Sequence, residues 1–109
     1  MAGLGNASLN IIWTKPALAD LDQIADYIAL DKPDAAKRLV HRVFESVERL
    51  ADFPKSGSCP KELRGTTYRH LIIPPLRIFY RVHEKQIFII CVMRGERLFH
   101  LDELTGREK

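Results

Sequence analysis

The side chains of this sequence that are best suited to chemistry are arginines set among aromatic and β-branched residues in its second half. Over residues 64–97 arginines outnumber carboxylates. A guanidinium group binds phosphate or carboxylate oxygens through parallel hydrogen bonds, so this pattern indicates a surface that meets an anionic or acidic partner. The predicted target-binding residues are Arg69, Arg77, Arg81, Arg94 and Arg97. The same alternation is also typical of solvated positions on one face of a sheet.

The cysteines and histidines do not form the patterns of metal or thiol sites. Cys59 lies in a loop rich in Pro, Gly and Ser, and Cys91 lies in an apolar run. Neither has a CxxC or histidine partner at metal-ligand spacing, and the same holds for His41, His70 and His83. We therefore predict no metal, no cofactor and two reduced thiols, which are typical of a cytoplasmic protein.

Length and composition indicate one folded domain. The chain has 109 residues, of which 46% are hydrophobic, and this is enough for a core. The net charge of +3 permits nucleic acid as a partner without requiring it. No apolar run reaches the roughly 20 residues of a membrane span, and the start lacks the pattern of a signal peptide. We predict a single domain over residues 1–109, with a flexible extension at 1–8 and a tail at 98–109.

The first half is predicted to form a strand and then a helical hairpin. Residues 9–13 are β-rich. Thr14 is a suitable cap for the next helix, and Asp31 for a second one. Because the break between the helices is short, they should be antiparallel. Apolar residues at helical spacing form one stripe on each helix and include Leu21, Ile24, Ile28, Leu39 and Val43.

The second half is predicted to form a three-stranded antiparallel meander over residues 67–73, 76–82 and 86–93. Its links are too short for a parallel crossover. The last strand is apolar on both faces, which places it centrally, with the N-terminal strand or another segment on its open edge. The fold class is therefore α+β.

Alternation along these strands predicts which side chains share a face. It groups Ile78, Tyr80 and Val82 against Arg77, Phe79 and Arg81, and Phe88, Ile90, Val92 and Arg94 against Ile87, Ile89, Cys91 and Met93. In the tail, Leu98, Leu101 and Leu104 at spacing three predict a short C-terminal helix.

Several short motifs stand in order along residues 9–100. They are Trp13 ahead of Ala17-Leu-Ala-Asp20-Leu, Pro33-Asp34-Ala-Ala-Lys37, Leu50-Ala-Asp-Phe-Pro54, Leu63-Arg-Gly65 leading into Tyr68-Arg69, Arg77-Ile-Phe-Tyr80-Arg81, and Val92-Met-Arg94-Gly-Glu-Arg97. This ordered set resembles the RelE/ParE superfamily of type II toxin–antitoxin toxins. The resemblance covers nearly the whole chain and implies the arrangement of elements given above.

The resemblance also implies a cognate antitoxin and a target whose inhibition stops growth. ParE-like members act on DNA gyrase, whereas RelE-like members bind the ribosome and cleave mRNA. The toxin–antitoxin complex is expected to bind operator DNA through the antitoxin. We expect an antitoxin segment that folds on binding to lie across the hairpin of residues 15–52 and partly near the sheet. The predicted antitoxin-binding residues are Leu21, Ile24, Ile28, Leu39 and Val43.

The choice of target depends on whether the chain carries the groups that cleave RNA. Without a metal, cleavage needs a base, cations that hold the phosphate, and an acid. RelE-like chains supply these groups from their later strands and the segment after the last one. Arg77 matches the third-strand arginine, but Leu71 and Gly95 stand where cations are expected. His100 is the one nearby acid–base candidate.

Because this set is incomplete, we predict no catalytic residues and a ParE-like toxin of plasmid stabilisation systems that acts on DNA gyrase. Two alternatives remain. One is a RelE-like, ribosome-dependent mRNA interferase. The other is a degenerate toxin that serves only as an antitoxin-binding module.

Overall fold

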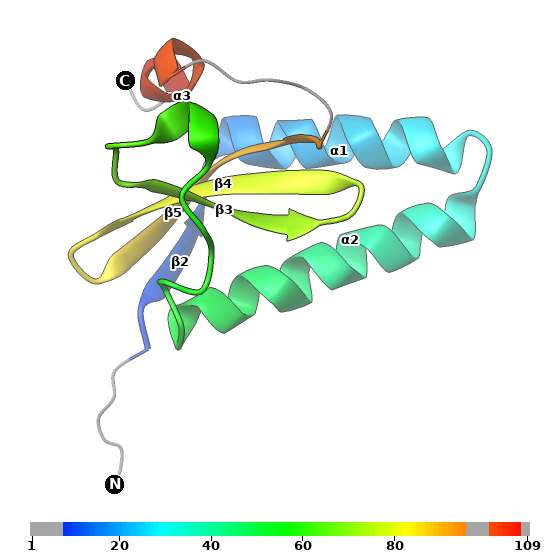
Figure 1. Ribbon diagram of the computed structural model, residues 1–109. Helices are drawn as coiled ribbons and strands as arrows, with labels where there is room; N and C mark the ends of the chain where they lie inside the picture. Colours follow the sequence, from blue (N-terminus) through cyan, green and yellow to red (C-terminus); the bar gives the residue numbers. More distant parts are fainter. Residues whose placement is uncertain (1–7, 96–100, 108–109) are drawn as a thin grey trace, which may run out of the picture.

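A four-stranded sheet with two long helices packed on one face makes up this chain (Figure 1). The computed structural model describes residues 8–95 and 101–107. The elements are β2 (Asn10–Trp13), α1 (Lys15–Ala29), α2 (Pro33–Glu48), β3 (Tyr68–Ile73), β4 (Leu76–His83), β5 (Gln86–Arg94) and α3 (Leu101–Arg107). Short 3-10 turns, η1 (Arg49–Ala51) and η2 (Lys61–Leu63), lie between α2 and β3. Within the described residues, no helix is both long and apolar enough to cross a membrane.

The strand order is β2-β5-β4-β3. β3, β4 and β5 form the predicted antiparallel meander, and β2 pairs with β5 in parallel. The prediction that the last strand is central is confirmed, and of the two candidates for its open edge, the N-terminal strand or another segment, it is the N-terminal strand that pairs there. The apolar character of β5 on both faces has a physical reason, because side chains cover it on both sides.

The hairpin of α1 and α2 begins as expected but one of its caps differs. Thr14 caps α1, since its hydroxyl accepts a hydrogen bond from the N–H of Ala17 at 3.3 Å. The prediction of Asp31 as the cap of α2 is wrong, because Lys32 is the N-cap residue and makes no side-chain cap bond. The N–H of Asp31 instead bonds to the carbonyl of Ile28 and closes the last turn of α1.

Two apolar clusters lie on opposite faces of the sheet. The first is enclosed by α1 and α2 and contains Ala17, Leu21, Leu39, Val43, Val47, Leu50, Ile73, Leu76, Ile78, Tyr80, Ile87, Ile89 and Val92. The second lies on the far face and contains Leu63, Tyr68, Phe79, Ile90, Cys91, Met93 and Leu104. The far face is thus covered by η2 and α3 rather than by a second helical layer.

A bulge in β5 changes the faces that strict alternation predicted. Ile89 pairs with Tyr80 and Cys91 pairs with Phe79, so Ile90 is an extra residue on its strand. The faces beyond Ile90 therefore exchange. Val92 joins the cluster under the helices, while Cys91 joins the far face. The prediction for this end of the strand is wrong because the extra residue shifts the period by one.

The short C-terminal helix is present as α3, and Leu104 from it is fully buried in the far-face cluster. Residues 1–7, which hold most of the predicted flexible extension, lie outside the described residues, as do Arg97, Leu98 and His100.

Candidate functional site

Arg77 on β4 is the most enclosed of the described candidate arginines, and its partners are a carboxylate and a histidine. The Arg77 side chain donates from Nη1 and Nη2 to the two carboxylate oxygens of Glu62, at 3.0 and 2.9 Å. Its Nε donates to Nδ1 of His70 at 3.2 Å. The guanidinium also lies 4.8 Å from the ring centre of Phe79, a cation–π distance. Arg77 is only 9% exposed.

The loop between α2 and β3 brings Glu62 over the sheet. Leu63, next to Glu62, is 1% exposed and anchors η2 in the far-face cluster. The same loop is fixed at Gly57, whose N–H donates to the hydroxyl of Tyr80 at 3.0 Å. A Cβ at position 57 would lie 2.5 Å from that hydroxyl, so the backbone approaches closely only because the residue is glycine.

Glu62, His70 and Arg77 form a trio in which hydrogen bonding and burial shift the pKa values of Glu62 and His70. The hydrogen bond from Arg77 is the main reason that the pKa of Glu62 is lowered. Burial, followed by the charge of Arg77, lowers the pKa of His70. At neutral pH Glu62 is therefore ionised and His70 is neutral, with Nδ1 accepting from Arg77 and Nε2 carrying the proton.

The lowered pKa of His70 predicts a loss of stability in mild acid. Below about pH 6.5 the unfolded chain binds a proton at this histidine more readily than the folded chain. The free energy of unfolding therefore falls as pH drops through 6.5, until the folded-state pKa is passed. Glu62 titrates at lower pH and contributes little to this window. Thermal melts from pH 7.5 to 5 should show a steeper fall for the wild type than for His70→Asn. Parallel curves would contradict this assignment.

The other predicted target-binding arginines lie at separate places. Arg69 donates to the carbonyls of Gly57 and Lys55, at 2.7 and 3.4 Å. Arg81 lies 5.5 Å from the ring centre of Phe88. Arg94 is exposed and lines a hollow with Gln23, Ile24 and Tyr27 from α1. Arg97 lies outside the described residues.

These positions divide the arginines into different roles. Arg77 and Arg81 pair with Met93 and Phe88 of β5, both on the far face. Arg94 lies instead beside α1, on the helical side. The predicted target-binding arginines that the structure describes thus do not form one cationic patch. Sequence reasoning missed Glu62 entirely and dismissed His70 for its lack of spaced partners.

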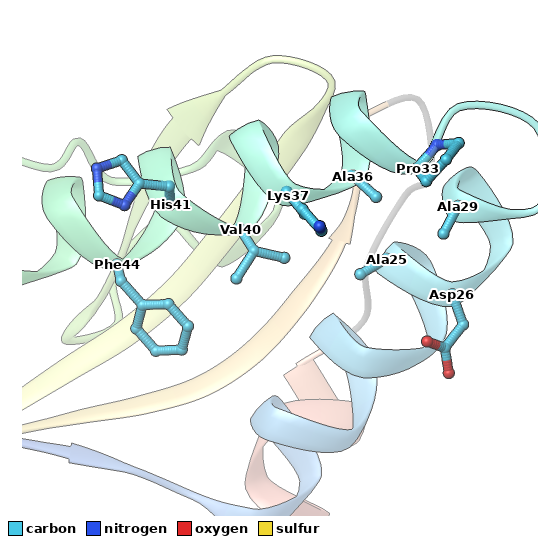
Figure 2. Close-up of a pocket in the computed structure, with 9 residues that line it drawn as sticks. All are labelled: Ala25, Asp26, Ala29, Pro33, Ala36, Lys37, Val40, His41 and Phe44. Atoms are coloured by element: carbon cyan, nitrogen blue, oxygen red, sulfur yellow. The ribbon is translucent and has the colours of Figure 1, made fainter.

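A second candidate site is a groove of about 480 Å³ between α1 and α2. Figure 2 shows small side chains from both helices facing it, with Ala25 and Ala29 on α1 and Ala36 on α2. Val40 and Phe44 continue the apolar lining toward the sheet, where the Phe44 ring lies 5.0 Å from that of Trp13.

The rim of the groove carries charge of both signs. Asp26 stands on the α1 side, and Lys37 and His41 stand on the α2 side (Figure 2). Because alanines fill little space, the two helices leave a channel at this point of the hairpin rather than packed side chains. The groove can therefore receive bulky apolar side chains from outside, flanked by polar contacts.

The predicted antitoxin-binding residues do not line this groove. Leu21, Leu39 and Val43 are 3%, 5% and 0% exposed, so in this state they offer almost no surface to a partner. Ile24 and Ile28 are half-buried against the same core. Each helical stripe faces the sheet. Ile24 and Ile28 keep some exposed surface, since each lines a separate hollow beside α1.

Comparison with known proteins shows that this chain is similar to toxins. The family described as "ParE toxin of type II toxin-antitoxin system, parDE" matches residues 11–99. A putative toxin named Y4kP from Sinorhizobium fredii is 39% identical over 87 residues, which cover 80% of this chain and 88% of the relative. Toxin RelE2 of Caulobacter vibrioides is 36% identical over 89 residues, which cover 81% and 97%.

A solved structure described as the chromosomal ParDE TA system from P. aeruginosa has the same fold. It matches with a TM-score of 0.71 at 29% identity, over 82% of this chain and 98% of that chain. The similar proteins thus carry both ParE and RelE names, and the solved ParDE structure shares the fold of this chain.

Proposed function

Because this chain belongs to the ParE/RelE family of type II toxin–antitoxin toxins, we propose that it arrests growth by acting on DNA gyrase. A cognate antitoxin neutralises it. The proposal places the chain on the ParE-like branch and takes the toxin to act in the cytoplasm, where gyrase is found.

The observation that supports the ParE-like branch over RNA cleavage is the bonding of Arg77. The resemblance to RelE-like chains makes Arg77 the counterpart of the third-strand arginine, one of the groups that supply RNA cleavage, among them the cations that hold the phosphate. Here both terminal nitrogens of Arg77 bind Glu62, and its Nε binds His70. A phosphate would have to displace a carboxylate that already uses the bidentate geometry of the guanidinium. This arrangement favours a structural arginine over a phosphate-binding one.

One observation favours the alternative of an mRNA interferase. A carboxylate, an arginine and a histidine within hydrogen-bond distance are the groups that metal-free RNA cleavage uses. Glu62, Arg77 and His70 form such a set. His70 is 8% exposed, however, and one of its two nitrogens is taken by Arg77. RNA would therefore reach this trio only if the loop carrying Glu62 moved.

Assays on purified components distinguish these targets. We expect the toxin to inhibit supercoiling by gyrase and to trap cleaved DNA on the enzyme, with no new ends in translated mRNA by primer extension. New mRNA ends without trapped DNA would establish the ribonuclease instead. A toxin that causes no growth arrest when induced would identify a degenerate, antitoxin-binding module.

For the antitoxin, we propose an amphipathic helix seated in the groove between α1 and α2. Helices that bind grooves present apolar side chains at helical spacing, and the alanine-lined channel leaves room for them. The charged rim favours an acidic residue beside Lys37 and a basic residue beside Asp26. The remainder of the antitoxin would bind operator DNA.

A further inference from the structure

The edge of β5 is longer than the strand that covers it. β2 pairs with β5 only from Gln86 to Ile89. The pairing ends at Thr14, where the chain enters α1. The N–H and the hydroxyl of Thr14 both donate to the carbonyl of Ile89, at 3.1 and 2.7 Å. Among the described residues, no strand covers this side of β5 beyond that point. An uncovered strand edge leaves backbone groups that need other partners.

Two side chains supply these partners. The carboxylate of Asp20 on α1 accepts a hydrogen bond from the N–H of Val92 at 3.0 Å. The guanidinium of Arg107 on α3 donates to the carbonyl of Ile90 at 3.1 Å. One donor and one acceptor of the edge are thus satisfied, as a neighbouring strand would satisfy them.

Asp20 and Arg107 also bind each other. Arg107 Nη1 and Nη2 contact the two carboxylate oxygens of Asp20 at 2.6 and 3.1 Å. α1 packs on one face of the sheet and α3 on the other, and α3 lies beside the first turns of α1 although the two are far apart in sequence (Figure 1). The ion pair therefore joins the two layers around the uncovered edge.

α3 is short, and its described side chains bury little apolar surface. It has seven residues, far fewer than an isolated helix needs to be stable in water. Among its residues with described side chains, only Leu104 is fully buried. The ion pair keeps partial contact with solvent, since its side chains are 29% and 17% exposed. Segments with these properties open locally without global unfolding.

We propose that Asp20 and Arg107 form a latch, which replaces the missing strand partner of β5 and holds α3 on the far face of the sheet. The latch opens as a local unit while the core between the helices and the sheet stays folded. Opening releases α3 and exposes the N–H of Val92 and the carbonyl of Ile90 together.

Hydrogen exchange of the full chain, read amide by amide, tests the latch. Arg107→Ala removes the charge-assisted hydrogen bonds that hold the Asp20 carboxylate against the N–H of Val92. Hydrogen exchange at the Val92 amide should therefore become about 10- to 100-fold faster. Amides within α2 and β4 should keep their protection. Arg38→Ala, at an exposed arginine of α2, is the matched control. It should change neither the exchange at Val92 nor the protection of α2 and β4.

The double variant adds a second criterion. If the residues act as one latch, Asp20→Ala together with Arg107→Ala should speed exchange at Val92 no more than the larger single effect. Unchanged exchange at Val92 in Arg107→Ala would overturn the proposal, and so would an equal loss of protection in α2 and β4. Because Arg107 lies near the end of the chain, this single variant remains informative even if Asp20→Ala fails to fold.

Discussion

Replacing Ala25 by glutamate is expected to weaken antitoxin binding about 100-fold while the toxin stays folded and toxic. Ala25 lines the groove between α1 and α2 and contributes little packing of its own. A carboxylate there would be buried beneath the bound antitoxin helix. Burying an unpaired charge costs several kcal/mol, and about 2.7 kcal/mol already corresponds to a 100-fold change in affinity. Titration of the antitoxin against the purified variant measures the loss.

The control for this variant is Ala19→Glu on the same helix. Ala19 is exposed and lies away from the groove lining, so the same substitution there should leave affinity nearly unchanged. In cells, the Ala25 variant should arrest growth even when the antitoxin is co-expressed. Equal affinities for the two variants would place the antitoxin elsewhere on the toxin.

The elements themselves could be predicted because their signals are local. Links of two or three residues permit only antiparallel neighbours, and the helical periodicity of α2 is sustained over 16 residues. The central position of β5 followed from apolar side chains on both of its faces. Each inference needed only the composition of one short segment.

The faces of β5 beyond Ile90 could not be predicted in this way. A single extra residue reverses the period, and nothing in the run Ile89-Ile-Cys-Val92 distinguishes a bulge from a regular strand. The bulge depends on which residues of β4 lie opposite, which is a property of two strands together.

The trio around Arg77 was hidden from sequence for a similar reason. The alternation of Arg77 with apolar neighbours is compatible with a solvated face or with a target site. What decides its role is Glu62, which a loop 15 residues away in sequence lays over the sheet. Loop paths depend on contacts such as that of Gly57 with Tyr80, and these carry no periodic signal.

The groove between α1 and α2 could not be predicted from helical periodicity. Periodicity identified the apolar stripes of the hairpin correctly, but a stripe marks what is buried and not what remains open to a partner. The channel is lined by alanines, which any count of large apolar residues passes over. Its position depends on how closely the two helices approach.

Removing the charge of Arg94 is expected to lower the proposed activity of the toxin against gyrase by about 10- to 100-fold without loss of antitoxin binding. Arg94 is exposed at the end of β5, beside Tyr27 of α1, where a partner can reach it. Loss of a hydrogen bond to a charged group costs about 1.5–3 kcal/mol, which gives this range. The readout is the toxin concentration that traps half-maximal cleaved DNA on gyrase, for Arg94→Ala against wild type.

Two further variants separate contact with the target from support of the fold. Arg38→Ala, on the exposed surface of α2, should leave gyrase trapping unchanged. Arg77→Ala should instead lower the melting temperature, because Glu62 and His70 lose their shared partner inside the protein. If Arg94→Ala trapped cleaved DNA on gyrase as well as the wild-type toxin does, Arg94 would not belong to the target-binding surface.

His100 decides between the two branches independently of the arginines. It lies outside the described residues. A metal-free ribonuclease needs a group that donates a proton near neutral pH, and histidine suits this by its ordinary pKa. If the chain cut mRNA with His100, the variant His100→Ala would lose about 10²- to 10⁴-fold in rate. A gyrase toxin requires no such group, so we expect His100→Ala to remain toxic. A folded, antitoxin-binding but harmless His100→Ala variant, with cut mRNA ends in the wild type, would reverse the choice of target.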